Sequence, residues 1–426
     1  MKSFTKEEWA WIMYDWANSA FATIMVAALF PTFFVAVADA QGIQGSVWWG
    51  FGVAGARLVV GVCAPFIGSI IDYRNYKKRL FSMFLGLGIL ATLFVAVSYR
   101  WELLLLGYVL ANMFWSAGNI IYDSYLPDVT EPQRMDKVSA WGYAIGYIGG
   151  STIPFAASIA LVVLGGNIGI DTTMAVRISV VMTAVWWGVF SWPILRNVHH
   201  KHGAQIPVRG LAFETVKNVW ATARKIFQDK AMFTFILAYF FYIDGVNTVI
   251  NMAAVYGAQL GLGAEGMLGA LFVTQLVAVP CSILFGQMSK KMHSLKLISG
   301  AVCVYIAICI TGFFMGWGLE EGWFGYDIAA VMFWVMAVMV GTVQGGIQAI
   351  SRSTFARLVP PEQAGEYFGF FEIFGRFAAI IGPATYSFVL IITGRGSLAV
   401  VSITLLFVVG LVVLAKGRKY LKTALA

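Results

Sequence analysis

The chain has few charged residues. Only 12% of its 426 residues are Asp, Glu, Lys or Arg, whereas 59% are hydrophobic. Soluble domains carry roughly 25% charged residues, so the composition excludes an ordinary soluble protein. Apolar runs of about 20 residues, the length of a helix that crosses a bilayer, follow one another along the chain. We predict an all-α membrane protein with twelve transmembrane helices, at residues 9–38, 46–71, 80–98, 102–125, 138–164, 174–196, 231–257, 265–288, 295–317, 326–350, 366–392 and 396–415.

Cysteine and histidine are scarce as well, with 4 of each. The cysteines fall within predicted spans and have no disulfide spacing, and the histidines fall in predicted loops. His199, His200 and His202 could be read as a metal cluster. A solvated loop explains these three neighbours without a metal, because no second group of ligands accompanies them. We therefore expect no metal site.

The sequence also lacks the motifs of enzymes and pumps. No histidine lies in a predicted span, and neither a His-Glu-x-x-His nor a Gly-x-Ser-x-Gly pattern occurs. We therefore expect no enzymatic activity. A Gly-x-x-x-x-Gly-Lys-Ser/Thr loop is missing too, which excludes a nucleotide-driven pump within this chain. We expect no cofactor other than a coupling ion, either a proton or sodium.

The charges that are present lie mostly on one side. If the N-terminus is cytoplasmic, Lys and Arg gather in the cytoplasmic segments, and the external segments hold only Arg100, Arg177 and Arg395. This is the positive-inside asymmetry of membrane proteins. It explains the net charge of +8 without a nucleic-acid partner. We predict a multi-pass protein of the cell (inner) membrane with both termini cytoplasmic.

Several unusual residues recur at one constant spacing, 244 − 15 = 229. The recurring pairs are Asp15 and Asp244, Asn18 and Asn247, Pro132 and Pro361, Gly146 and Gly375, and Pro154 and Pro383. A repeat in register indicates a duplicated bundle, with a site between its halves that opens to each side of the membrane in turn. We predict two pseudo-symmetric six-helix bundles, residues 1–196 and 231–426, joined by a cytoplasmic linker, residues 197–230.

The second part of this linker is predicted to be an amphipathic helix. Its apolar residues recur at helical spacing and its basic residues form a counterface; the apolar set is Leu211, Val216, Val219, Trp220, Ala223, Ile226 and Phe227, and the basic set is Arg209, Lys217, Arg224 and Lys225. Such a helix either lies on the inner leaflet, held by apolar burial and anionic lipid, or packs on the bundle as an ordinary connection.

Two loop motifs resemble a known signature. Gly68-Ser-Ile-Ile-Asp72 precedes a basic run after the second predicted span, and Gly286-Gln-Met-Ser-Lys290 ends the eighth. They resemble the Gly-x-x-x-Asp loop of the major facilitator superfamily (MFS). The match is partial, because Asn75 or Tyr76 stands where a second glycine is expected and Lys290 replaces the second acid. In that superfamily the Asp pairs with basic and helix-end groups to latch the two halves, and the resemblance implies this role for Asp72.

A closer resemblance is to the vacuolar amino-acid effluxer family and its bacterial relatives. The segments that carry it are Met13-Tyr-Asp15-Trp-Ala-Asn18-Ser-Ala-Phe21, Tyr122-Asp123-Ser124-Tyr-Leu-Pro127-Asp128 and Gly345-Gly-Ile-Gln348-Ala-Ile-Ser351-Arg352-Ser-Thr-Phe-Ala-Arg357-Leu-Val-Pro360-Pro361. The resemblance covers nearly the whole chain. It implies secondary transport, with amino acids as the cargo of the yeast member.

Buried acids are the candidate ion-coupling groups. Asp15 and Asn18 share one face of the first span, and Asp244, Asn247 and Asn251 share one face of the seventh. The superfamily resemblance implies that these faces line a central cavity. A buried Asp there can take and release a proton, whereas a carboxylate with amide oxygens can hold sodium. Alternatively, each Asp-Asn pair only braces its helix against a neighbour.

Arg57 lies near the middle of the second span, where a charge is energetically costly and therefore indicates a partner or a function. The loop-motif spacing pairs its position with Gln275 in the eighth span. The resemblance implies that Glu372 and Arg376, four residues apart on the eleventh span, face it as ion-coupling partners or a gate. Arg57 either binds an anionic group of the cargo, such as a carboxylate, or forms a structural ion pair.

The remaining candidates divide into binding and gating residues. Asn112, Gln344 and Gln348 add neutral polar groups facing the expected cavity. The repeat spacing matches Asp123 with Arg352 and Asp128 with Arg357, each time with opposite sign. With Asp72, these four suit a cytoplasmic latch that breaks in one state of the cycle.

We conclude that the sequence encodes a secondary active transporter of a small polar organic solute, such as an amino acid. It would work by alternating access, coupled to protons, in a lipid bilayer and as a monomer. The alternatives are a sodium-coupled sugar or organic-acid symporter, and a lipid or lysolipid transporter or scramblase of the same fold.

Overall fold

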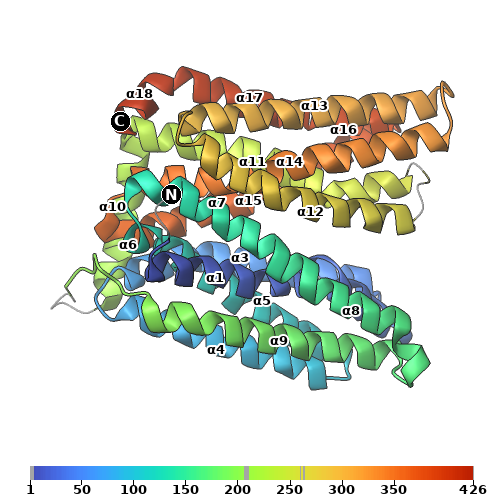
Figure 1. Cartoon of the computed structure of the whole chain (residues 1–426), viewed down its shortest axis with the longest axis horizontal. Helices are drawn as coiled ribbons and strands as arrows, with labels where there is room; N and C mark the ends of the chain where they lie inside the picture. The colour runs from blue at the N-terminus through green and yellow to red at the C-terminus, as the bar shows by residue number, and fades with distance from the viewer. Residues whose placement is uncertain (1–3, 206–210, 260, 262–263, 426) are drawn as a thin grey trace. The chain divides into compact units, whose positions relative to one another are not determined.

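The computed structural model describes residues 4–205, 211–259, 261 and 264–425, so residues 206–210 of the expected linker, with Arg209, lie outside it. Over these residues the chain is helical, and the one β-type pairing is a single bridge between Tyr73 and Ala204. Twelve helical segments of the described chain are long and apolar enough to cross a membrane. Each overlaps one predicted span, which confirms the predicted fold class (Figure 1).

The chain divides into two compact units. Unit 1 comprises Met1–Val138, Ile145–Trp220 and Val359–Phe370, and unit 2 comprises Ser139–Ala144, Ala221–Leu358 and Phe371–Ala426. Each unit thus takes a short piece from the opposite half of the sequence. The expected domain boundaries, at residues 196 and 231, stay a prediction.

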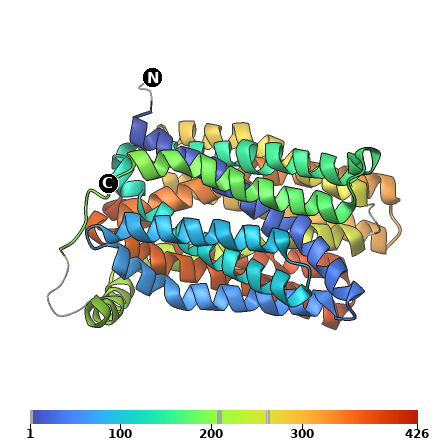
Figure 2. The ribbon, with the colours of Figure 1, turned by 90° about the horizontal axis from the view of Figure 1, so that it is seen from below.

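Unit 1 is built from the helices of the first half. They are α1 (Lys6–Phe21), η1 (Ala22–Ala27), α2 (Leu29–Ala40), α3 (Gly45–Ile71), α4 (Tyr76–Val97), α5 (Trp101–Ser124), α6 (Leu126–Val129), η2 (Pro132–Arg134), α7 (Met135–Gly146), η3 (Tyr147–Thr152), α8 (Ile153–Leu164), η4 (Gly165–Ile168) and α9 (Thr172–Asn197), with η5 (Pro361–Gln363) from the second half. Residues 139–144 of α7 belong to unit 2. Within unit 1, α4 packs against both α5 and α9 (Figures 1 and 2).

Unit 2 holds the remaining helices. They are α11 (Lys230–Gln259), α12 (Ala264–Met288), α13 (Ser294–Glu320), α14 (Tyr326–Leu358), α16 (Gly396–Ser402), α17 (Thr404–Lys416) and α18 (Arg418–Ala424); α10 (Leu211–Gln228) and α15 (Ala364–Thr393) begin in unit 1 and continue into unit 2. In unit 2, α14 packs on α12 and α13, while α11 packs on α17.

Prolines account for two irregular spans. The span Lys6–Ala40 passes through the π-helical segment η1 and bends at Ala28, whose φ is −125° and ψ −73°. Pro31 follows three residues later, and in a regular α-helix its ring would clash with the carbonyl of Ala27, four residues before it. Pro154 stands in the same relation to Gly150, inside the π-helical segment η3. Both helices therefore widen immediately before a proline.

The two repeated acids, Asp15 and Asp244, each pack against a glycine, although the two glycines are not separated by the repeat spacing. In unit 1, a Cβ added to Gly146 would lie 2.8 Å from the hydroxyl of Ser19 and close to Asp15. In unit 2, a Cβ on Gly382 would overlap Thr248, which is the repeat equivalent of Ser19, and would lie 2.9 Å from Asp244. In both units, an acid and a small hydroxyl residue on one helix therefore pack closely against glycine.

Candidate functional site

Asp244 occupies the tightest of these contacts. Its side chain is 0% exposed, midway along α11. The backbone N–H of Gly382 donates to Oδ1 at 3.0 Å, and the Thr248 hydroxyl donates to the Asp244 carbonyl at 2.7 Å. Oδ2 is buried and has no hydrogen-bond partner among the described residues. A charged carboxylate oxygen without a donor in an apolar interior is far more costly than a neutral, protonated carboxyl.

The structure also supports part of the bracing alternative. Asp244 bonds the backbone of the neighbouring helix α15, and Asp15 packs against Gly146 of α7 through the equivalent face. Asp15 and Asn18 are both buried in unit 1, and the Asn18 carbonyl accepts a hydrogen bond from the indole of Trp115. The expected approach of Asp15 to Asp244 joins two units and stays a prediction.

Arg57 stands beside a polar ladder on α5. Its charge interacts with the Tyr108 phenol. The Asn112 amide donates to the Tyr108 hydroxyl at 3.1 Å, and the Ser116 hydroxyl donates to the Asn112 carbonyl oxygen at 3.3 Å. Residues 108, 112 and 116 share one face because they are four apart on a helix. Two predicted binding residues, Arg57 and Asn112, thus both act on Tyr108, which the sequence analysis did not single out, and the ladder adds Ser116.

Unit 2 offers a second polar group of side chains. A cavity of about 90 Å³ lies among α11, α12, α13 and α14, and Gln275 and Gln344 line it with Tyr256, Thr274 and apolar side chains. The Gln275 carbonyl oxygen is buried without a hydrogen-bond partner among the described residues. Three other predicted binding residues do not line this cavity: Asn247 is half-buried, Asn251 is exposed, and Gln348 donates to the Gln344 backbone at 3.2 Å.

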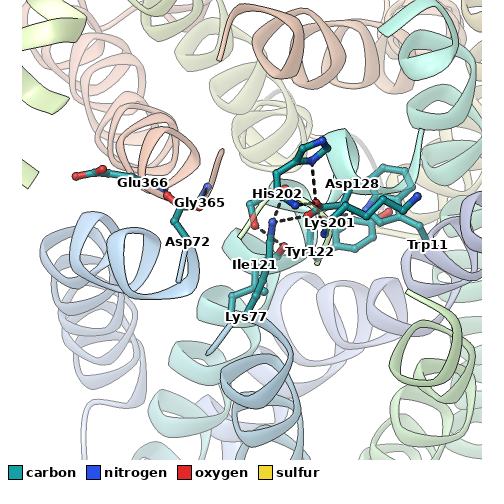
Figure 3. A network of polar contacts seen from close by, with 11 residues as sticks. Trp11, Asp72, Lys77, Ile121, Tyr122, Asp128, Lys201, His202, Gly365 and Glu366 are labelled. Atoms are coloured by element: carbon teal, nitrogen blue, oxygen red, sulfur yellow. Dashed lines mark hydrogen bonds and ion pairs between the residues drawn. The ribbon is translucent and has the colours of Figure 1, made fainter. Parts of the chain in front are cut away.

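The Asp72 loop forms a buried contact with the start of α15 (Figure 3). The backbone N–H groups of Gly365 and Glu366 donate to Oδ1 and Oδ2 of Asp72 at 2.7 and 2.9 Å. A Cβ on Gly68 would overlap the Gly365 carbonyl, so the glycines permit this close approach. A carboxylate at a helix N-terminus satisfies otherwise unpaired N–H groups. Burial raises the pKa of Asp72 to about 8, although nearby Lys77 and the two N–H groups lower it.

Next to this loop lies a buried ion pair. Lys77 Nζ lies 2.8 Å from Asp128 Oδ2, and the two side chains are only 1% and 2% exposed. The Lys77 ammonium also donates to the Ser124 carbonyl at 2.9 Å. Burial alone would raise the pKa of Asp128, but Lys77 holds it below its usual value. Asp128 bonds Lys77 because α4 begins beside the end of α5. Its expected part with Arg357 in a latch joins two units and stays a prediction.

The chain after α9 closes over the same pair. The backbone N–H groups of Lys201 and His202 donate to Asp128 Oδ1 at 2.9 and 3.2 Å, and His202 Nδ1 lies 3.1 Å from it. We call residues 199–205 the strap. Its residue Ala204 donates to the Asp72 carbonyl at 2.8 Å and accepts from the Arg74 N–H at 2.9 Å. The strap thus links the Asp72 loop to the end of α5.

The histidines of the strap have separate environments. Both ring nitrogens of His200 are buried without a hydrogen-bond partner in the described part of the chain. Burial, together with nearby Lys77, lowers the pKa of His200 to about 4. His202 faces Asp128, and His199 is exposed beside Glu7. Across the described residues, no group of three or more His, Cys, Asp or Glu is placed to hold a metal.

The other predicted gating residues lie in buried or half-buried contacts. In unit 2, Arg352 Nε donates to the Ser139 hydroxyl at 2.9 Å and its guanidinium lies 4.5 Å from the Tyr143 ring centroid. Arg357 donates to the Ser294 hydroxyl at 2.6 Å. Glu372 and Arg376 form an ion pair with each other. Asp123 lies one residue before the end of α5. The contact of Glu372 and Arg376 with Arg57 joins two units and stays a prediction.

Comparisons with known proteins place this arrangement in a family. The vacuole effluxer Atg22-like family matches residues 51–417. The chain is 40% identical over 422 residues to the uncharacterized MFS-type transporter YxiO of Bacillus subtilis (strain 168), covering 97% of this chain and 95% of YxiO. It is 26% identical to autophagy-related protein 22 of Cryptococcus neoformans var. neoformans serotype D (strain B-3501A), covering 66% of this chain and 54% of that protein.

The fold agrees with solved transporters. The crystal structure of the MFS proton:xylose symporter XylE, bound to 6-bromo-6-deoxy-D-glucose, superposes with a TM-score of 0.72 at 12% identity, covering 96% of this chain and 95% of that one. Identity this low shows the fold alone. Together with the family match, it shows that the chain belongs to the vacuole effluxer Atg22-like family and is a multi-pass membrane transporter of the MFS type.

Proposed function

We propose that this protein is a secondary active transporter that couples a small polar organic solute, with an amino acid favoured, to proton movement. The observation that carries the proposal is Asp244, which is wholly buried in a span with Oδ1 bonded to Gly382 and Oδ2 without a partner among the described residues. Such a carboxyl can hold a proton in one state and lose it when water or a cation reaches Oδ2.

Arg57 is proposed as the group that binds the solute carboxylate. A guanidinium offers a planar fork of donors, and the neighbouring phenol of Tyr108 and amide of Asn112 can bond further polar atoms of the solute. The ladder continues to Ser116, so a solute with several donors and acceptors would be satisfied along α5. An amino acid has such a set of polar groups.

Asp72 is proposed as one latch of the transport cycle. Its two hydrogen bonds to the start of α15 hold that helix end against the Asp72 loop, and they must break if α15 is to move away. Arg352 with Ser139 is proposed to serve in the same way in unit 2. We further propose that both termini and these latches face the cytoplasm and that the protein works as a monomer in the cell membrane.

A screen followed by a transport assay tests the proposal. Thermal shifts of the purified protein with amino acids, small peptides, organic acids and sugars, each with and without sodium and across pH, identify a stabilising solute. That solute is then offered to proteoliposomes with an imposed proton gradient. Uptake that a protonophore abolishes is expected. Uptake that follows a sodium gradient alone, or hydrolysis of the solute by the purified protein, would contradict the proposal.

A further inference from the structure

Helix α10 carries an exposed apolar stripe. Val216, Trp220 and Phe227 are 49%, 75% and 63% exposed. At 3.6 residues per turn these three positions fall within about 40° of one another around the helix axis. Large apolar side chains that gather on one side of a surface helix mark a contact with something outside the fold. We call these three residues the α10 stripe.

Another side of α10, about 100–140° round the helix from the centre of the stripe, is already occupied by the protein. Thr215, Thr222 and Ile226 are buried, and the Asn218 amide donates to the Tyr73 hydroxyl at 3.0 Å. The helix is therefore packed on the fold through one face while the α10 stripe remains uncovered. The two alternatives raised by the sequence, packing on the bundle and lying on a leaflet, use different faces and are compatible.

The α10 stripe is continuous with a membrane span. The Phe227 ring lies 5.6 Å from the ring of Phe233, in the first turns of the span Lys230–Ala253. Only Asp229 separates α10 from α11, and its carboxylate accepts the N–H groups of Ala231 and Met232 at 2.8 and 3.0 Å. This short, capped junction holds the end of the stripe at the level where the span enters the bilayer.

Basic residues flank the α10 stripe. Lys217 and Arg224 lie about 40–100° further round the helix than the stripe residues, and both are exposed. Glu214 is the acid of α10, and it lies 3.5 Å from Lys217. Apolar side chains beside cations at a membrane surface match the acyl-chain boundary and the headgroups of anionic lipid.

We propose that α10 lies in the plane of the inner leaflet as an anionic-lipid docking helix. The α10 stripe enters the boundary between headgroups and acyl chains, and Lys217 and Arg224 bind lipid phosphates. The inference rests on the proposed cytoplasmic orientation and is independent of the cargo and of the coupling ion.

Photo-crosslinking in nanodiscs tests this docking. The photoreactive amino acid p-benzoylphenylalanine is placed in the full chain by Trp220→p-benzoylphenylalanine, and, as a matched control, by Ala221→p-benzoylphenylalanine. Ala221 is exposed on the same helix but points about 100° away. In discs of phosphatidylcholine with phosphatidylglycerol, the probe at position 220 is expected to form severalfold more lipid adducts than the probe at 221.

A charge variant tests the basic residues separately. Lys217→Gln/Arg224→Gln keeps the α10 stripe intact and is expected to reduce phosphatidylglycerol adducts at position 220 by about fivefold for each charge removed. Adducts in phosphatidylcholine alone should not change. Equal lipid labelling at 220 and 221, adducts to protein instead of lipid, or phosphatidylglycerol labelling that ignores the charge variant would each overturn the proposal.

Discussion

The buried pair of Lys77 and Asp128 gives the most quantitative prediction. Asp128→Asn keeps a side-chain oxygen near the Lys77 ammonium but removes its negative charge, so a cation that is only 1% exposed is left without a counter-charge, bonded to neutral oxygens such as the Ser124 carbonyl. An unpaired buried charge lowers the free energy of unfolding by about 3–5 kcal/mol. Lys77→Met should lower stability less than Asp128→Asn does, because the Asp128 carboxylate keeps the N–H groups of Lys201 and His202.

The double variant separates the interaction energy of the pair from the contribution of each residue alone. Lys77→Met/Asp128→Asn buries no net charge, so its loss of stability should be smaller than the sum of the single losses by about 2–3 kcal/mol. The assay is equilibrium unfolding in mixed micelles titrated with a denaturing detergent. The pair of Arg100 and Glu102 is the matched control, since it has the same 2.8 Å separation but side chains 73% and 41% exposed. Arg100→Gln should leave the free energy of unfolding unchanged within the error of the measurement, because water screens an exposed pair.

Additive losses in the double variant would refute this reasoning, because they would mean that Lys77 and Asp128 act independently. A loss in Arg100→Gln as large as that in Asp128→Asn would refute it as well. Equal losses would show that burial does not determine the strength of these two ion pairs, which have the same separation.

Three further predictions follow from other sites. Burial lowers the pKa of His200 from about 6.5 to about 4 in the folded protein. Between these pH values the imidazole is protonated in the unfolded chain but not in the folded one, so stability falls as the pH drops from about 6.5 toward 4. Because His200 as a whole is only half-buried, this loss of stability should be roughly 1–2 kcal/mol. His200→Gln should remove that part of the pH dependence in thermal melts at stepped pH. Gly382→Ala places a methyl against Thr248 and should lower stability by about 1–3 kcal/mol; added Thr248→Ala should restore part of it, and no rescue would contradict the packing. Arg57→Lys loses the planar fork and should weaken binding of a carboxylate solute about tenfold with unchanged thermal stability; equal affinity in a titration would exclude Arg57 from the site.

The sequence predicts the spans well because their signal is local. Each crossing needs about 20 apolar residues, and that pattern does not depend on what the helix contacts. The repeat extends only partly to the contacts: Asp15 and Asp244 each pack against a glycine, but these are Gly146 and Gly382, which are not separated by the repeat spacing. Proline positions alone do not predict which spans widen, because Pro31 and Pro154 follow π-helical segments whereas Pro383, the repeat partner of Pro154, lies inside the regular helix α15.

The partners of the charged residues could not be predicted in the same way. Asp128 and Arg357 share the repeat spacing, yet Asp128 bonds Lys77, Lys201 and His202, and Arg357 bonds Ser294. These contacts depend on the reach of long side chains and on the path of the strap, and neither produces a periodic pattern in the sequence. The strap is the clearest example of an unpredictable contact. It binds Asp128 through backbone N–H groups, which are present whatever the residue type and therefore leave no signal in the sequence.

The most direct test of the central claim is transport by Asp244→Asn in proteoliposomes loaded with the stabilising solute. Asn keeps the size of the side chain and an oxygen for the Gly382 N–H, but it cannot take up a proton. We predict that solute exchange across the membrane continues while uptake driven by an imposed proton gradient is lost. Gradient-driven uptake at the rate of the unaltered protein would show that Asp244 does not carry the proton, and would contradict the account.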